Sequence, residues 1–109
     1  MHASDLTDRW VDKTLTREQI YDYLAKDVIG EARREHHIGL AHVAECCQHI
    51  YLWATHQVPA VGDFLTAIIN NDLMKSVQHA DDINRELLWV YVIFLYNVPP
   101  AGWRKRSKQ

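Results

Sequence analysis

Residues 72–97 read DLMKSVQHADDINRELLWVYVIFLYN, and this stretch decides the fold. It contains neither proline nor glycine, and one stripe of positions recurs at spacings of four, three, four, three, four and three. A mean period of 3.5 residues is typical of a helix that packs at a shallow angle against another long helix. The positions of the stripe are Leu73, Val77, Ala80, Asn84, Leu87, Tyr91 and Phe94. The stripe predicts one long helix over 72–97, which Pro99 and Pro100 end.

A second long helix is predicted over 31–56, a range with no proline and a single glycine. Apolar residues recur there every three or four positions, as in an amphipathic helix. Thr16 and Gln19 form a capping-box pattern that opens a shorter helix over 17–29. No stretch alternates between apolar and polar residues as a strand would. We therefore expect an all-α protein: a compact helical bundle with two long helices, about 31–56 and 72–97, and shorter ones.

The chain has 109 residues, the length of one domain. We expect a single helical domain over 1–103 and a disordered basic tail over 104–109. The four basic residues of the tail are Arg104, Lys105, Arg106 and Lys108. Of the 12 basic and 14 acidic residues, 8 basic and all 14 acidic ones lie in 1–103, so the domain carries a net charge of −6. A nucleic-acid binder needs a basic face on its folded body, so this balance argues against one.

The cysteines and the apolar runs indicate a cytoplasmic protein. Cys46 and Cys47 are neighbours and cannot close a loop by a disulfide, which fits a reducing compartment. The first ten residues lack the apolar core of a signal peptide. The longest apolar run, Leu87 to Tyr96, has ten residues, whereas about 20 are needed to cross a bilayer. We expect no contact with a membrane.

Four short motifs follow one another in the second half of the chain. They are Phe64-Leu65-x-Ala67, Asn71-Asp72-Leu73, Ala80-Asp81-x-x-Asn84 and Leu95-Tyr96-Asn97-x-x-Pro100. Over about residues 58–103 this pattern resembles small, uncharacterised helical proteins of phages and prophages. Common members continue with a Cys-Trp-Gly type segment, where this chain has Ala101-Gly102-Trp103. The resemblance implies a viral accessory protein with a compact helical fold, acting in the cytoplasm of the host cell.

Three residues of the helix over 31–56 are weak candidates for metal ligands: His42, Cys46 and His49. Their spacings of four and three place them on one helix face, where neighbouring side chains can share an ion. One helix supplies at most three ligands, so a closed tetrahedral site would need another, such as His79. The alternative is a polar stripe at the edge of a helix interface. We expect that the protein needs no metal and no cofactor.

No catalytic motif supplies a nucleophile, and the two cysteines lie within a helix, away from the helix N-terminus that would activate a thiol. We therefore expect a non-enzymatic accessory protein that inhibits or modulates a host or defence protein by protein–protein contact. Aromatic residues are frequent interface anchors. The candidate interaction residues are Trp53, Asn84, Tyr91 and Trp103. Asn84 lies on the apolar stripe, where a polar residue commonly fixes register or oligomeric state.

We also expect a homodimer, because a 26-residue helix is about 39 Å long, which is large for a domain of this size. Two other functions stay open at this point. One is a nucleic-acid-associated regulator that uses the basic tail, with Arg104, Lys105, Arg106 and Lys108 contacting phosphates. The other is a metal-binding helical protein that uses the His/Cys cluster.

Overall fold

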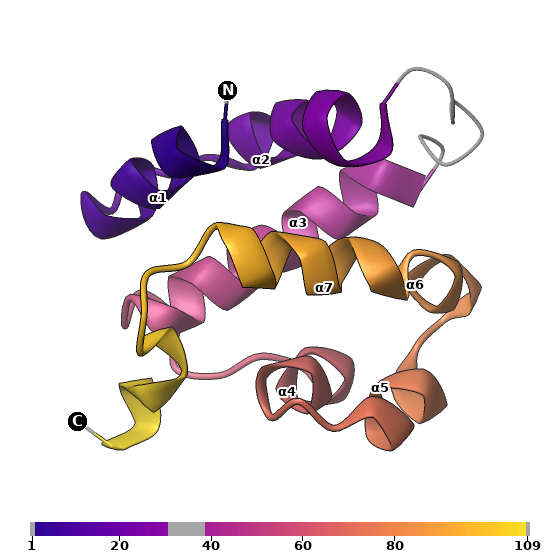
Figure 1. Cartoon of the computed structure of the whole chain (residues 1–109). Coiled ribbons are helices and arrows are strands. Elements are labelled where there is room, and N and C mark those ends of the chain that lie inside the picture. The colour runs from indigo at the N-terminus through magenta and orange to yellow at the C-terminus, as the bar shows by residue number, and fades with distance from the viewer. Residues whose placement is uncertain (1, 31–38, 109) are drawn as a thin grey trace.

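The computed structural model describes residues 2–30 and 39–108. Within these ranges the chain forms helices and no strand, which confirms the predicted all-α class (Figure 1). The α-helices are α1 Ala3–Val11, α2 Arg17–Tyr23, α3 Leu40–Ala54, α4 Asp63–Ile69, α5 Leu73–His79, α6 Asp82–Glu86 and α7 Leu88–Asn97. A π-helical segment, η1 Leu24–Ile29, continues α2, and a 3-10 helix, η3 Trp103–Lys108, follows α7.

The helices surround α7, which crosses the middle of the molecule (Figure 1). In that view α1 and α2 lie above α7, α3 passes behind it at an angle, and α4 and α5 lie below it. The most extensive helix contacts join α2 to α3 and α4 to α5. The Cα radius of gyration is 13.1 Å, as expected for a compact domain of about 100 residues.

The capping box predicted at Thr16 is present. The Gln19 backbone N–H donates to Thr16 Oγ1 at 3.2 Å, and the Gln19 side-chain oxygen accepts from the Thr16 N–H at 3.0 Å. The predicted helix over 17–29 corresponds to α2 and η1. Gly30 ends it at a φ of +76°, a value that glycine adopts without strain, and its N–H donates to the carbonyl of Ala25.

The helix predicted over 31–56 is described from Gly39 onward, and α3 covers Leu40–Ala54. The part of that prediction over 31–38 lies outside the described residues. Gly39 packs directly against α6, because a Cβ atom there would overlap a methyl group of Ile83. The start of α3 therefore requires a glycine for close approach between the two helices.

The single helix predicted over 72–97 is wrong, because α5, α6 and α7 share that range. Ala80 is extended, with ψ at 139°, and the Asp81 side chain accepts the backbone N–H of Asn84 at 2.7 Å, which starts α6 as an N-cap. Arg85 donates to the carbonyl of Ala80 at 3.0 Å, so the freed backbone oxygen keeps a partner. A second irregular residue, Leu87, separates α6 from α7. The N-cap formed by Asp81 therefore starts a new helix, although the apolar stripe continues through this position.

The core lies where α1, α2, α3 and α7 meet. Trp10 is at its centre: its ring packs edge-on against Tyr51, with centroids 5.3 Å apart, and lies 6.5 Å from Phe94. The Thr7 hydroxyl donates to the carbonyl of Val98 at 2.5 Å and ties α1 to the end of α7. The fully buried large side chains are Tyr51, Tyr91, Phe94, Leu6, Ile20, Leu24, Leu40, Ile50, Val43, Val90, Val98 and Cys47.

None of the helices in the described part of the chain has both the length and the apolar character needed to cross a membrane.

Candidate functional site

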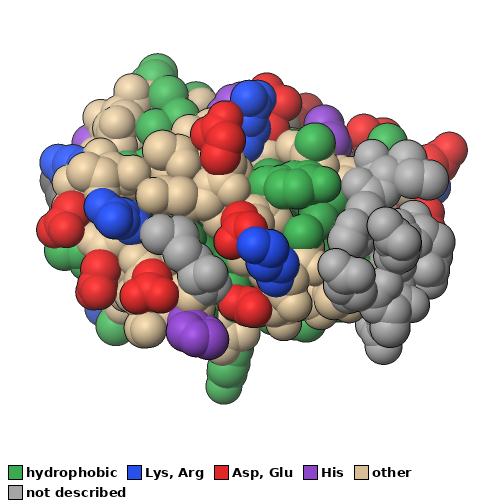
Figure 2. Space-filling view, turned by 90° about the horizontal axis from the view of Figure 1, so that it is seen from above, with side chains coloured by type: hydrophobic (Ala, Val, Ile, Leu, Met, Phe, Trp, Pro, Cys, Tyr) green, Lys and Arg blue, Asp and Glu red, His purple; other side chains and the backbone are tan. Residues whose placement is uncertain are grey.

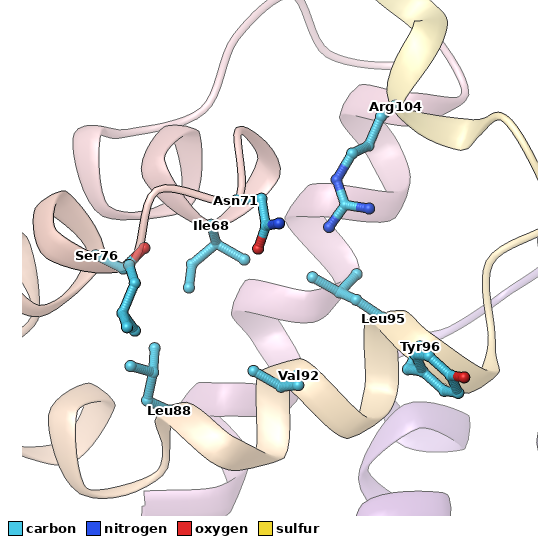
Figure 3. Close-up of a pocket in the computed structure, with 9 residues that line it drawn as sticks. Ile68, Asn71, Ser76, Leu88, Val92, Leu95, Tyr96 and Arg104 are labelled. Atoms are coloured by element: carbon cyan, nitrogen blue, oxygen red, sulfur yellow. The ribbon is translucent and has the colours of Figure 1, made fainter.

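An open groove of about 280 Å³ runs between α7 on one side and the α4–α5 pair on the other (Figure 3). We call it the α5/α7 groove. It is lined by Ile68, Asn71, Leu73, Ser76, Leu88, Val92, Leu95, Tyr96 and Arg104.

The floor and the rim of the groove differ in exposure. Ile68, Ser76 and Leu95 are buried and form the floor. Val92 and Tyr96 on α7 are 61% and 87% exposed, and Leu73 on α5 is 69% exposed. Isolated exposed apolar side chains are common on proteins, but here they gather from two helices around one depression, which is typical of an interaction site.

The turn between α4 and α5 closes one end of the groove. The N–H of Asn71 donates to the carbonyl of Ile68 at 3.0 Å, and that of Asp72 donates to Ala67 at 2.9 Å. This is the pattern of a Schellman motif, with Asn71 in the left-handed region at a φ of +57°. Asp72 then caps α5 by accepting the N–H of Lys75 at 3.0 Å. The turn is thus a helix end followed by a helix cap.

Arg104 stands at the same end of the groove as Asn71, and both side chains extend into it (Figure 3). Its Nε–H donates to the carbonyl of Ile69 at 2.8 Å, and its guanidinium lies 4.5 Å from the centroid of the Trp103 ring. Trp103 in turn packs edge-on against Trp10, 6.1 Å away. Arg104 is therefore part of the fold, and the expectation that a disordered tail begins at 104 does not hold for this residue.

A buried polar network joins α6, α7 and α3. The Tyr91 hydroxyl donates to Oδ1 of Asn84 at 2.7 Å, and the Asn84 amide nitrogen lies 3.4 Å from Nε2 of His42. Asn84 and Tyr91 are both buried. Within one chain they join α6 and α7 in the core, and their role as interaction residues stays a prediction. Burial, with Cys47 and Cys46 nearby, raises the pKa of Tyr91.

Of the three candidate metal ligands, only His42 and Cys46 lie close together. Cys46 Sγ lies 3.6 Å from Nε2 of His42, and Asp81 Oδ2 lies 3.8 Å from the same nitrogen. His49 is exposed on α3, seven residues from His42. Among the residues that the structure describes, no three His, Cys, Asp or Glu side chains form a group able to hold a metal ion.

The thiols are poorly suited to nucleophilic chemistry. Burial raises the pKa of Cys46, although the neighbouring Tyr91 hydroxyl acts in the opposite direction. Burial also raises the pKa of Cys47, well above its ordinary value. A thiol is nucleophilic as the thiolate, so both cysteines are held in the unreactive form near neutral pH.

The other predicted interaction residues lie apart from one another. Trp53 is half-buried on α3, and Trp103 is half-buried against Trp10. Lys105 is exposed in η3. The side chains of Arg106 and Lys108, predicted to contact phosphates, lie outside the described residues.

The surface formed by α1 and α2 has a different character. Figure 2 shows acidic and basic side chains interspersed on this side of the molecule. A depression of about 510 Å³ lies between α2 and α3, and its charged groups include Arg17 and Glu18, which pair at 3.5 Å. Such a mixed, self-paired surface is typical of a solvated face.

Sequence reasoning missed the α5/α7 groove, although one signal for it was present. No charged residue occurs between Glu86 and Arg104, so α7 is apolar around its whole circumference. A helix of that kind needs a cover on every side, whereas a single core stripe covers one. The exposed Val92 and Tyr96 are what remains uncovered.

No protein-family model, no curated protein and no solved structure matches this chain.

Proposed function

We propose that this protein is a non-enzymatic interaction protein that binds its partner in the α5/α7 groove. The observation that carries the proposal is the convergence of exposed apolar side chains from two helices on one depression. Leu73, Val92 and Tyr96 line it, and Met74 and Val77 are further exposed apolar side chains of α5. A contiguous apolar surface gains free energy when a partner covers it, at about 25 cal/mol per Å².

The groove fits the way in which a partner helix is bound. Leu88, Val92 and Tyr96 follow one another at a spacing of four along α7, so they form one ridge that faces the groove. An amphipathic helix that lays its apolar face between such a ridge and a second helix is a recurrent mode of protein recognition. Large apolar and aromatic side chains carry most of the binding free energy in interfaces of this kind.

The resemblance to phage and prophage proteins indicates the origin of this protein and the kind of partner that it binds. On that basis the protein is a phage or prophage accessory protein, and its partner is a host or defence protein in the cytoplasm of the host cell. The raised thiol pKa values support the non-enzymatic reading, because they remove the chain's two cysteines as nucleophiles.

A second copy of the chain is the other occupant that the groove admits. The sequence-based reason for a homodimer was the length of two 26-residue helices, whereas the longest described helix, α3, has 15 residues. The argument for a dimer is instead that a second copy of the chain would cover the exposed apolar groove. Light scattering over a concentration series distinguishes the two occupants, because a dimer doubles the mass of 12.7 kDa without any partner.

The chain offers a matched pair of substitutions to test the proposal. Val92 on α7 and Val11 at the end of α1 are both 61% exposed, and only Val92 lines the groove. A photo-reactive amino acid placed at Val92 should crosslink to one specific protein in a host lysate, and the same residue at Val11 should not. The crosslink should disappear when Tyr96→Glu is added. Equal crosslinking at both positions, or a Val92 crosslink that survives Tyr96→Glu, would contradict the groove as the binding site.

A further inference from the structure

The α5/α7 groove ends at a fixed positive charge. From this we infer that the bound partner helix carries an Asp or Glu side chain among its apolar residues, and that this carboxylate pairs with Arg104. The inference rests on the proposed function and specifies the chemistry of the partner.

Arg104 is held in place before any partner binds. Its Nε–H is used by the carbonyl of Ile69 at 2.8 Å, and one face of the guanidinium lies over Trp103 at 4.5 Å. The carbonyl belongs to the last residue of α4, whose other terminal carbonyls are satisfied by the Schellman motif. The anchor is thus a main-chain atom of a helix end, and the guanidinium loses little further freedom on binding.

The remaining N–H groups of the guanidinium are directed at the groove. Figure 3 shows the Arg104 side chain extending toward the space between Asn71 and Leu95. Among the described residues no carboxylate forms an ion pair with Arg104; the ion pairs there involve Arg17, Lys26, His42 and Arg85. With Nε–H bonded to Ile69, the Nη1 and Nη2 groups still form one edge with two parallel N–H groups, which matches the two oxygens of a carboxylate. The Asn71 amide lies at the same end and can donate to the same group.

The rest of the groove wall indicates which class of molecule carries the carboxylate. Apart from Arg104, its lining has no charged side chain, and five of the nine residues are aliphatic. A polyphosphate backbone would place most of its charges against this apolar wall and on a domain whose residues 1–103 carry a net charge of −6. A helix fits better if its aliphatic residues, at spacings of three and four, cover the apolar wall. One acidic residue at the end of that helix then pairs with Arg104.

The test selects 14-residue helix-forming peptides from a display library that bind the full-length protein and fail to bind Val92→Glu. The selected peptides should be enriched in Asp or Glu at one position relative to their aliphatic residues. The same selection on Arg104→Glu should enrich Lys or Arg at that position. Val11→Glu, with its matched exposure, should yield the same peptides as the unmodified protein.

Binding measurements on one selected peptide then isolate the pair. Replacing its acidic residue with the amide should weaken binding to the unmodified protein about tenfold, the effect of a charge-assisted hydrogen bond at a partly exposed site. The same replacement should have no effect on binding to Arg104→Gln. Because the change is made in the peptide, the measurement does not depend on the stability of the variant, and Arg104→Lys serves as a second variant that keeps the charge.

The outcomes separate this inference from the proposed function. Peptides that depend on Val92 but show no acidic preference would overturn the role of Arg104 and leave the groove as the binding site. Peptides whose binding is indifferent to Val92 would contradict the groove itself. An acidic preference that persists unchanged with Arg104→Gln would also overturn the inference.

Discussion

The two faces of α7 are both apolar, but one is buried and the other is exposed to solvent. Val90, Tyr91 and Phe94 on one face are completely buried, with Phe94 against Trp10 of α1 and Tyr91 against Phe64 of α4. Val92 and Tyr96 on the other face are mostly exposed at the α5/α7 groove. The difference teaches that apolarity alone does not tell a core residue from a binding residue. What distinguishes them is whether the chain has a second element long enough to cover the face, and α5 with seven residues is too short.

The largest expected effect tests this contrast with two aromatic residues of α7. Phe94→Ala should lower the free energy of unfolding by about 3–5 kcal/mol, because it leaves a cavity in the core. Tyr96→Ala should change it by less than about 0.5 kcal/mol, since that ring is 87% exposed. Urea denaturation followed by circular dichroism measures both. Similar losses for the two variants would mean that the groove face is covered in solution, as in a stable dimer.

The buried polar network gives the next largest effect. Tyr91→Phe removes the hydroxyl that donates to Asn84 Oδ1 and leaves that buried oxygen without this donor. The free energy of unfolding should fall by about 1–3 kcal/mol. Tyr96→Phe removes the same hydroxyl from an exposed ring and should change stability by less than about 0.5 kcal/mol. A Tyr91→Phe variant as stable as the original would show that the network contributes nothing net to the fold.

Alkaline pH should destabilise the core side of α7. Burial raises the pKa of Cys47 above its ordinary value of 9.0 and that of Tyr91 above 10.0. Between the unfolded and folded pKa values the unfolded chain binds fewer protons than the folded one. Stability from these groups is therefore complete below about pH 9 and falls as the pH rises, by up to about 1.4 kcal/mol per pH unit for each group.

Urea denaturation between pH 8 and pH 11 measures this dependence. Tyr91→Phe should flatten the part of the decline that begins near pH 10, and Cys47→Ala the part that begins near pH 9. Half-buried Cys46 and buried Tyr23 have raised pKa values as well, so each variant should reduce the slope without abolishing it. A slope that neither variant changes would show that these two groups ionise without unfolding.

Sequence patterns predicted the parts of the structure that depend on local chemistry. Thr16 and Gln19 form the predicted capping box, because capping depends on atoms of neighbouring residues. Of the stripe over 72–97, Leu87, Tyr91 and Phe94 are buried, whereas Leu73 and Val77 are exposed. The continuity of the stripe was misleading, since Asp81 satisfies a backbone N–H more effectively at a helix start than within a helix.

The groove depends on contacts between distant residues, and no local pattern encodes them. Arg104 bonds to the carbonyl of Ile69, 35 residues earlier, and nothing in the basic run 104–108 marks its first member as different. Likewise, Asn84 on an apolar stripe indicated a polar contact, but only the structure shows that its partners within the chain are Tyr91 and His42.

The two helix caps offer the finest comparison between the core side and the groove side. Asp81 caps α6, whose Asn84 belongs to the buried network, and Asp72 caps α5 on the groove. Asp72→Ala should lower the free energy of unfolding by about 0.5–1 kcal/mol, the usual contribution of an N-cap. Asp81→Ala should cost about 1–2 kcal/mol, because the N–H it releases belongs to a buried residue and because its second oxygen lies 3.8 Å from His42. Asp81→Asn keeps a good cap and removes the charge, so it should recover most of the loss. Equal losses at the two aspartates would show that α6 is no more tightly coupled to the core than α5, and the contrast between the two sides of α7 would then end at α7 itself.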